Sequence, residues 1–211
     1  MYLNTKKTLT LLIVMVSICL CASPLFAKSI GIQLGYQQGT GEAEIWDDDT
    51  YSEYPEQDLW YFSIGGIIDL PLGSDGYLHN RFMLLYQAGT VYIYESDSYW
   101  SRDLDFSRFG IMNTLALEIS KKEESRLWWG PQLGLFIANG SDDVDLDYSG
   151  YAWALGFLLG YDFNINDDSL LSFEGGLRYG GMYLESDSSL DLGVYAYGFE
   201  IFIAASILFD M

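Results

Sequence analysis

Apolar and polar side chains alternate along most of this chain with a period of two residues. In the last segment every second residue is apolar, giving the series Tyr195, Tyr197, Phe199, Ile201, Ile203, Ala205, Ile207 and Phe209. In a β-strand these side chains all lie on one face. A strand in a soluble protein has about 5–6 residues, whereas a tilted strand that crosses a bilayer needs about 9–11. The length of this series therefore predicts a membrane-spanning strand.

The same alternation predicts eight strands in all. They are residues 28–38, 58–71, 81–94, 106–120, 127–138, 151–164, 169–184 and 192–210. Residues that favour turns separate several of them, as in 71–76 and 164–168. No segment keeps a 3.6-residue period, and the 22 glycines and 17 tyrosines favour strands over helices.

The connections between these strands alternate in length. Those after the first, third, fifth and seventh strands are mostly longer and very acidic, and they cover 39–57, 95–105, 139–150 and 185–191. Outer-membrane barrels have an even number of strands, short periplasmic turns and longer outer loops. We therefore predict an all-β fold, an eight-stranded antiparallel up-and-down transmembrane β-barrel with acidic loops outside the cell. The last strand should pair with the first near 30–36, so that no edge stays open.

A soluble periplasmic β-barrel is the alternative, and its apolar faces would point inward. Residues 151–163 argue against it, because seven bulky side chains on one face of this strand would overfill the inside of a small barrel. Aromatic residues also stand at both ends of that apolar face, as the two interfacial girdles of a membrane barrel require. The transmembrane interpretation is therefore favoured.

The beginning of the chain has a different pattern. Two lysines precede an apolar run over 11–20, and the segment ends on the small residue Ala27, although Leu25 stands where a small residue is preferred. This order is typical of a secretory signal peptide, and the run is too short for a membrane anchor. We predict a signal peptide over 1–27, with cleavage after Ala27, and one outer-membrane β-barrel domain over 28–211.

Both cysteines, Cys19 and Cys21, lie in the predicted signal peptide. The mature chain would then contain no disulfide, thiolate metal site or cysteine nucleophile. Lipidation at Cys21 is an alternative, but the bulky Leu20 before it lacks the small side chain that such a site needs.

The chain is strongly acidic, with 30 Asp and Glu against 10 Lys and Arg and a net charge of −20. Lys6 and Lys7 belong to the predicted signal peptide, so the mature chain would have eight basic residues and a net charge of −22. Half of the residues are hydrophobic and 17% are aromatic, which excludes an acidic disordered chain. The lack of basic patches excludes nucleic acid as a partner.

If the aromatic faces meet lipid, the opposite faces line the interior. An eight-stranded barrel is just wide enough for side chains to fill, and charges enclosed there should pair, because an unpaired buried charge is very costly. We predict a polar network in the lumen, formed by Arg108, Glu118, Glu174, Arg178 and Glu200. It would act as a structural plug, and the alternative is a narrow path for small solutes.

The acidic segments are candidates for divalent cations, since clustered carboxylates suit Ca²⁺ or Mg²⁺. The best spaced are Asp143, Asp145 and Asp147, which share one face of an extended segment. They lack the glycine and the terminal glutamate of an EF-hand loop. A solvated anionic surface is the simpler interpretation, and divalent bridging to anionic outer-leaflet lipids is a third; no resident cofactor is predicted.

No catalytic constellation stands out in the sequence. The single histidine, His79, follows a turn that should face the periplasm, and no nucleophile with a partnered base lies beside it. We therefore predict an interfacial turn histidine and a protein that is not an enzyme.

The pattern as a whole resembles the small outer-membrane β-barrel family, the eight-stranded proteins like the OmpA membrane domain, OmpX and OmpW. The resemblance covers nearly all of 28–211 and rests on glycine-rich aromatic alternation, on the segment GPQLGL at 130–135 and on the last strand. One departure is the end of the chain, Phe-Asp-Met at 209–211, where family members commonly end on an aromatic residue.

The resemblance implies surface roles such as adhesion, envelope integrity or passage of small apolar molecules, and it identifies the fold better than the function. We expect a non-enzymatic, monomeric protein of the bacterial outer membrane with a structural or surface-interaction role. Its expected partners are outer-membrane lipids, lipopolysaccharide and the outer-membrane assembly machinery.

Overall fold

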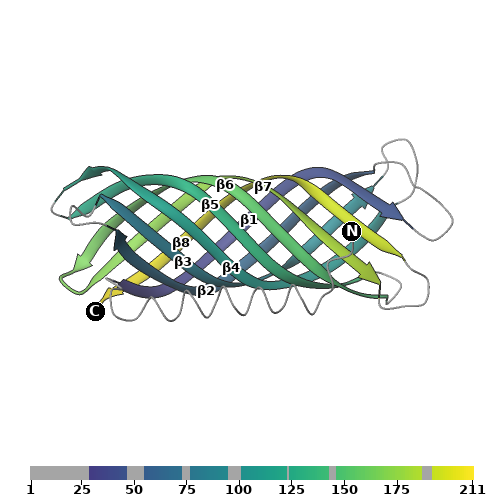
Figure 1. The fold of residues 1–211 in the computed structure, drawn as a ribbon, viewed down its shortest axis with the longest axis horizontal. Helices are drawn as coiled ribbons and strands as arrows, with labels where there is room; N and C mark the ends of the chain where they lie inside the picture. Colours follow the sequence, from purple (N-terminus) through teal and green to yellow (C-terminus); the bar gives the residue numbers. More distant parts are fainter. Residues whose placement is uncertain are drawn as a thin grey trace.

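Eight antiparallel strands form a closed barrel in the computed structural model of this protein (Figure 1). The structure describes residues 29–46, 55–72, 77–94, 101–122, 124–142, 146–186 and 192–211. The strands are β1 (Ser29–Trp46), β2 (Glu56–Leu72), β3 (Leu78–Tyr94), β4 (Ser101–Lys121), β5 (Ser125–Asp142), β6 (Asp147–Asn166), β7 (Ser169–Ser186) and β8 (Gly193–Asp210). Each strand pairs with the next, which confirms the predicted up-and-down topology. The segment predicted as a signal peptide lies outside the described residues.

The pairing of β8 with β1 closes the barrel where the sequence predicts it. Ile30 lies opposite Phe209 and Tyr36 opposite Ile203, and the Ser29 hydroxyl donates to the Asp210 carboxylate at 2.6 Å. We call the end of the barrel that carries Ser29 and Asp210 the inner end, and the opposite end the outer end.

The register of the eight pairings sets the tilt of the strands. Following opposed residues once round the barrel leads from Ile30 to Thr40 of the same strand, ten residues further along. A stagger of this size in an eight-stranded barrel requires strands inclined by about 40° to the axis. The ribbons in Figure 1 cross the long axis obliquely in this way. The barrel is therefore narrow, and side chains fill its interior.

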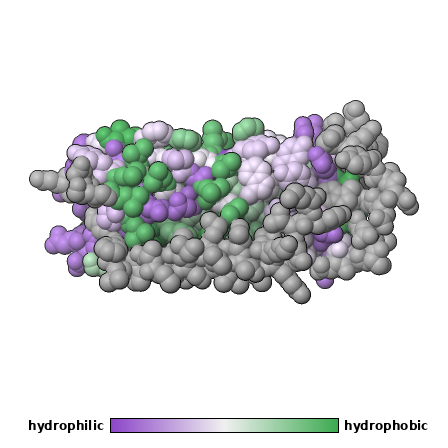
Figure 2. All heavy atoms as spheres, in the orientation of Figure 1, coloured by the Kyte–Doolittle hydropathy of each residue, from purple (hydrophilic) through white to green (hydrophobic). Residues whose placement is uncertain are grey.

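An apolar belt covers the outer surface of the barrel. Its side chains are highly exposed, as at Phe199 (66%), Ile201 (63%) and Ile203 (61%). On the face shown in Figure 2, hydrophobic side chains lie along the side of the barrel and hydrophilic ones gather at both ends, with a smaller hydrophilic patch between them. Soluble proteins do not leave so large an apolar surface in contact with water. No helix long and apolar enough to cross a bilayer occurs in the described parts of the chain.

Seven of the eight strands are longer than predicted, and in six of these the prediction is wrong at the outer end. β1 continues to Trp46 rather than ending at 38, and β4 begins at Ser101 rather than 106. With 17 to 21 residues each, the strands exceed the 9–11 that cross a bilayer. The apolar belt begins directly at the inner end, where Ile30 and Phe209 face outward. The surplus residues therefore extend the barrel beyond the belt at its outer end.

The pattern of polar and apolar positions inverts at the outer edge of the belt. Within the belt, apolar side chains face outward, and the lumen holds the polar ones together with apolar side chains such as Ile67, Leu85 and Phe202. Beyond it, carboxylates face outward while the interior is a packed apolar core, with Ala43, Ile93, Leu104, Leu184 and Val194 at most 1% exposed. The inversion is what a change of surroundings from hydrocarbon to water demands of one continuous strand. The outer end of the lumen is thus filled by apolar side chains.

Candidate functional site

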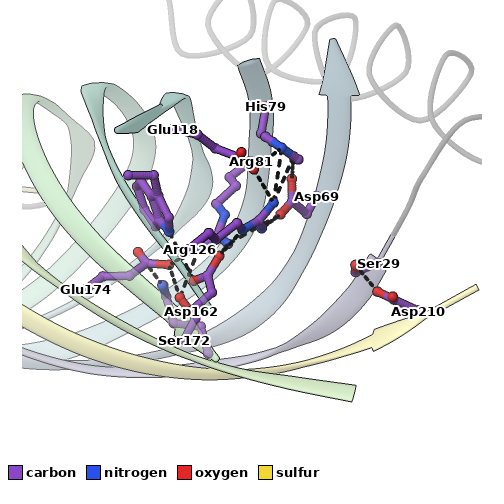
Figure 3. Close-up of polar contacts among 12 residues, drawn as sticks. Ser29, Asp69, His79, Arg81, Glu118, Arg126, Asp162, Ser172, Glu174 and Asp210 are labelled. Carbon is purple, nitrogen blue, oxygen red and sulfur yellow. Dashed lines mark hydrogen bonds and ion pairs between the residues drawn. The ribbon is translucent and has the colours of Figure 1, made fainter. Parts of the chain in front are cut away.

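Charged side chains fill the lumen at the inner end of the barrel. We call this group the inner cluster; it consists of Asp69, His79, Arg81, Glu118, Arg126, Asp162 and Glu174. They come from six strands, β2 to β7, and their side chains meet inside the barrel (Figure 3). The side chains of all but Arg126 are at most 4% exposed, so each charge depends on its neighbours rather than on water.

Arg81 is entirely buried within the inner cluster, as is Asp69. Its guanidinium donates to the Glu174 carboxylate at 3.0 Å and to Asp69 at 3.3 Å. It also pairs with Asp162, and its carbon Cζ lies 4.2 Å from the centre of the Trp128 ring. Glu174 stands 93 residues away in the sequence. Arg81 therefore joins opposite walls of the barrel.

Arg126 lies beside Arg81, nearer the mouth of the barrel. It donates short hydrogen bonds to the carboxylates of Asp69 and Asp162 and lies 3.5 Å from Glu118. Figure 3 shows its guanidinium in the middle of the cluster, between these acidic side chains. The two guanidinium groups thus share the carboxylates of Asp69 and Asp162, and each also pairs with one glutamate of its own. Removing either group would leave buried charge without a partner.

His79 is not the turn histidine that the sequence analysis predicts. It belongs to β3, is 3% exposed and points into the lumen. Its Nδ1 lies 3.1 Å from the Asp69 carboxylate and its Nε2 lies 3.0 Å from that of Glu118. The prediction fails because the turn is shorter than expected, so that His79 already shares the inward face of the strand with Arg81. The imidazole bridges two carboxylates inside the barrel.

The indole of Trp128 forms the floor of the inner cluster, and a glycine makes room for it. Gly160 is its register partner on β6, and a Cβ at that position would come within 2.1 Å of the indole Cζ2. The indole nitrogen donates to Asp162 at 3.0 Å. A close approach of this kind is a common reason for glycine within a strand.

A second polar layer crosses the lumen between the inner cluster and the apolar core. Arg108 lies 3.8 Å from Glu200, whose carboxylate also accepts a short hydrogen bond from the Tyr61 hydroxyl. Arg178 stacks on Phe202, with 3.5 Å between its Cζ and the ring centre. Each arginine also donates through Nε to a glutamine oxygen at 2.6 Å. This layer closes the middle of the barrel.

The structure places all five residues of the predicted lumen network inside the barrel but divides them between two layers. Glu118 and Glu174 belong to the inner cluster, whereas Arg108, Arg178 and Glu200 form the middle layer. Arg126 was not among the predicted lumen residues, although its even number puts it on the same face of β5 as the inward-facing Gln132. That parity was the signal that could have identified it.

The mouth of the barrel at the inner end contains a cavity of about 150 Å³. Its walls come from β4 to β7 and the turns between them, and both signs of charge line it, including Glu118, Lys121, Lys122 and Arg126. It lies directly outside the inner cluster. We call it the inner mouth.

At the other end, carboxylates surround the barrel above the apolar belt. We call this set the outer collar; it consists of Glu42, Glu44, Glu56, Asp58, Asp103, Asp105, Asp147 and Glu185, all at least partly exposed. Tyrosines stand between them and pack in tilted pairs, such as Tyr92 with Tyr94 and Tyr195 with Tyr197. Arg102 is the basic residue among the described residues of this region, and its guanidinium lies 3.6 Å from the carboxylate of the buried Asp142.

Several of these acidic residues were predicted to lie in loops, and the structure corrects this. Glu42 and Asp105 are strand residues, and Asp142 is a buried strand residue that accepts a hydrogen bond from the Tyr148 hydroxyl at 2.9 Å. Of the candidate metal ligands, Asp147 is exposed on β6, while Asp143 and Asp145 lie outside the described residues. Among the described residues no group of three or more His, Asp or Glu side chains could hold a metal ion.

Known proteins resemble this chain only distantly. No model of a known protein family matches this chain, and no curated protein matches it. Among solved structures, Neisserial surface protein A has 14% identity and a TM-score of 0.45, covering 86% of this chain and 97% of its own. Ail of Yersinia pestis, bound to a heparin analogue, has 15% identity and a TM-score of 0.37, covering 86% and 99%.

The outer membrane protease OmpT of Escherichia coli has 10% identity and a TM-score of 0.45, covering 88% of this chain and 97% of its own. Similarity at this level concerns the fold alone. The number, order and closure of the strands come from this chain's own structure, which has the architecture of the small outer-membrane β-barrels that its sequence resembles.

Proposed function

We propose that this chain is an integral outer-membrane protein of a Gram-negative-type bacterium, exported by residues 1–27, with a non-enzymatic role at the cell surface. The role is to hold the outer collar in the external medium, where it binds cationic partners. The observation that carries the proposal is the collar itself, with eight described carboxylates facing water on a rigid barrel wall.

Charge and tyrosine content together define the partner. Closely spaced carboxylates raise the local concentration of cationic ligands and speed their association. The tyrosine rings between them offer faces to ammonium and guanidinium groups, and such cation–π contacts add about 0.5–1 kcal/mol each at exposed sites. The collar lies on strands whose inner faces pack into an apolar core. Lysine- and arginine-rich segments of proteins are therefore the partners that fit this surface best.

Binding of an octa-arginine peptide to the protein in nanodiscs of zwitterionic lipid tests this proposal. A collar variant carrying Glu42→Gln, Asp58→Asn and Asp105→Asn should bind the peptide about tenfold more weakly, since each exposed pair contributes about 0.5 kcal/mol. The affinity should also fall as salt concentration rises.

A matched control removes three exposed carboxylates from the inner end, through Glu124→Gln, Asp167→Asn and Asp168→Asn. It changes the net charge by the same amount and should leave the affinity unchanged. Equal binding by the collar variant and the unaltered protein would refute the proposal.

A narrow channel for small solutes is the second candidate function, because polar side chains line the inner part of the lumen. The apolar core at the outer end argues against it, since water and ions do not enter a packed apolar interior. We expect planar-bilayer recordings of the purified protein to show no large, stable conductance. Steady porin-like currents would favour the channel instead.

The surroundings proposed for the protein follow from its surface. The apolar belt would contact outer-membrane lipids and lipopolysaccharide, with Ca²⁺ or Mg²⁺ bridging carboxylates to anionic headgroups where these come close. Insertion would use the outer-membrane assembly machinery, which would meet the outward series of β8 that ends at Phe209. A monomer suffices, because the barrel leaves no unpaired strand edge.

A further inference from the structure

We infer that the inner mouth is a binding site for a small zwitterion that carries a primary ammonium and a phosphate, the chemistry of phosphoethanolamine. This inference concerns the end of the barrel opposite the outer collar and is independent of the proposed function. It rests on the cavity, on one buried oxygen without a donor and on two lysines at the rim.

The buried oxygen is Oε2 of Glu118. The Glu118 side chain is 2% exposed, and its other oxygen, Oε1, faces His79 at 3.0 Å and Arg126 at 3.5 Å. Oε2 makes no hydrogen bond, and the Lys121 ammonium is 3.9 Å from it, beyond hydrogen-bond distance. A buried carboxylate oxygen without a donor is costly. Since Glu118 lines the cavity, a donor entering from the mouth can satisfy it, and a primary ammonium brings three N–H groups.

The cationic side of the site is the rim. Lys121 and Lys122 both line the cavity and both are exposed, Lys121 by 57%. Lys122 has no ion pair within the described ranges, and its backbone N–H donates to the Ser125 carbonyl at 2.8 Å, which holds the turn. Lysine is a common ligand for phosphate. A dianionic group at the rim would neutralise both ammonium groups.

The depth of these groups sets the orientation of the ligand. Among the residues that line the cavity, Glu118 is 2% exposed whereas Lys121 and Lys122 are exposed, so the ammonium would enter first and the phosphate would stay at the rim. Ile119, the next residue after Glu118, faces outward and is 56% exposed at the inner edge of the belt. The rim is therefore close to the level of lipid headgroups. The zwitterion can come from two sources, a free phosphoethanolamine or the headgroup of a phosphatidylethanolamine.

The test measures the thermal unfolding midpoint of the full mature barrel in detergent, followed by its heat-dependent shift on gels. O-phosphoethanolamine at ten times its Kd should raise the midpoint by about 3–6 °C. Phosphocholine has no N–H donor for Glu118, and inorganic phosphate has no ammonium, so each should give at most a tenth of the affinity. A shift by inorganic phosphate equal to that by phosphoethanolamine would overturn the inference, as would no shift with any of them.

Variants at the rim separate binding from stability. Lys122→Gln alters an exposed side chain, so the protein should fold normally and lose at least tenfold in affinity for O-phosphoethanolamine. Arg102→Gln, a control that removes one positive charge at the outer end, should keep the full affinity. Glu118→Gln should abolish the preference for phosphoethanolamine over phosphocholine. Unchanged affinity in Lys122→Gln contradicts the site.

Lipid nanodiscs distinguish the two sources. With a lipid headgroup in the site, native mass spectrometry should find phosphatidylethanolamine retained on the unaltered protein and lost from Lys122→Gln, with phosphatidylcholine retained on neither. With a free zwitterion as ligand, only O-phosphoethanolamine should remain bound. Retention of both lipids to the same extent by both proteins would contradict the headgroup source.

Discussion

Replacing Arg81 with methionine is expected to lower the free energy of unfolding of the barrel by about 3–5 kcal/mol. The methionine fills much of the space of the arginine stem but leaves the carboxylates of Asp69, Asp162 and Glu174 without the guanidinium that they share. Buried carboxylates that lose a partner cannot turn to water here, because the Arg81 side chain is entirely enclosed. Urea unfolding in lipid vesicles, followed by tryptophan fluorescence, measures the loss.

A second substitution shows whether uncompensated charge is the cause. Adding Asp162→Asn to Arg81→Met removes the charge of one carboxylate that has lost the Arg81 guanidinium, and it should recover part of the lost stability. Asp162→Asn alone should be destabilising. Strictly additive losses in the double variant would mean that the two residues do not interact. As a reference, Arg102→Gln should cost clearly less than Arg81→Met, because Arg102 is 21% exposed and the buried Asp142 keeps its hydrogen bonds from the Tyr148 hydroxyl and the Leu146 N–H.

Replacing Ile203 with arginine is expected to cost about 2–4 kcal/mol, the second large effect. Ile203 faces outward from β8 at about the middle of the apolar belt and is 61% exposed. In a soluble barrel an exposed side chain of this kind would tolerate a charge almost without cost. The size of the loss therefore reports how deeply this position lies in hydrocarbon. The free energy of folding into lipid vesicles, compared between the variant and the unaltered protein, measures it.

The matched control is on the same face of the same strand. Tyr195 lies opposite Glu44, beyond the belt, and Tyr195→Arg should cost little because the new charge meets water and a carboxylate. Equal losses of folding free energy for Ile203→Arg and Tyr195→Arg would contradict a membrane boundary at the outer edge of the apolar belt.

The part of the fold inside the belt follows closely from the sequence, and the part beyond it does not. Within the belt the outward residues are bulky and apolar and most polar residues face the lumen, and this period sets both the strand and its outward face. Beyond the belt the same period continues with the opposite assignment, carboxylates outside and apolar residues inside. Segments such as 39–46 therefore had the composition of loops, although the ladder of hydrogen bonds runs through them.

The interior was predictable in kind but not in its contacts. Parity along each strand correctly places Arg108 and Glu200 in the lumen. Which charges meet depends on the stagger of the barrel, because a tilted strand brings residues of distant sequence to one level. Arg81 and Glu174 face each other across the lumen for this reason, and a sequence carries no direct signal of that stagger. The sequence does not show how long the turn before β3 is. It therefore did not show that His79 belongs to the strand and lies on the same face as Arg81.

The inversion of the pattern also gives the protein a fixed immersion depth. Raising the barrel would expose the isoleucines and phenylalanines of the belt to water, and lowering it would bring the collar carboxylates into hydrocarbon, so both displacements are opposed. A barrel of this kind suits bilayers of one thickness, and a thicker or thinner bilayer would have to deform around it. The strands therefore match one hydrophobic thickness of the membrane. On β2 the outer boundary of that thickness lies between Trp60 and Asp58.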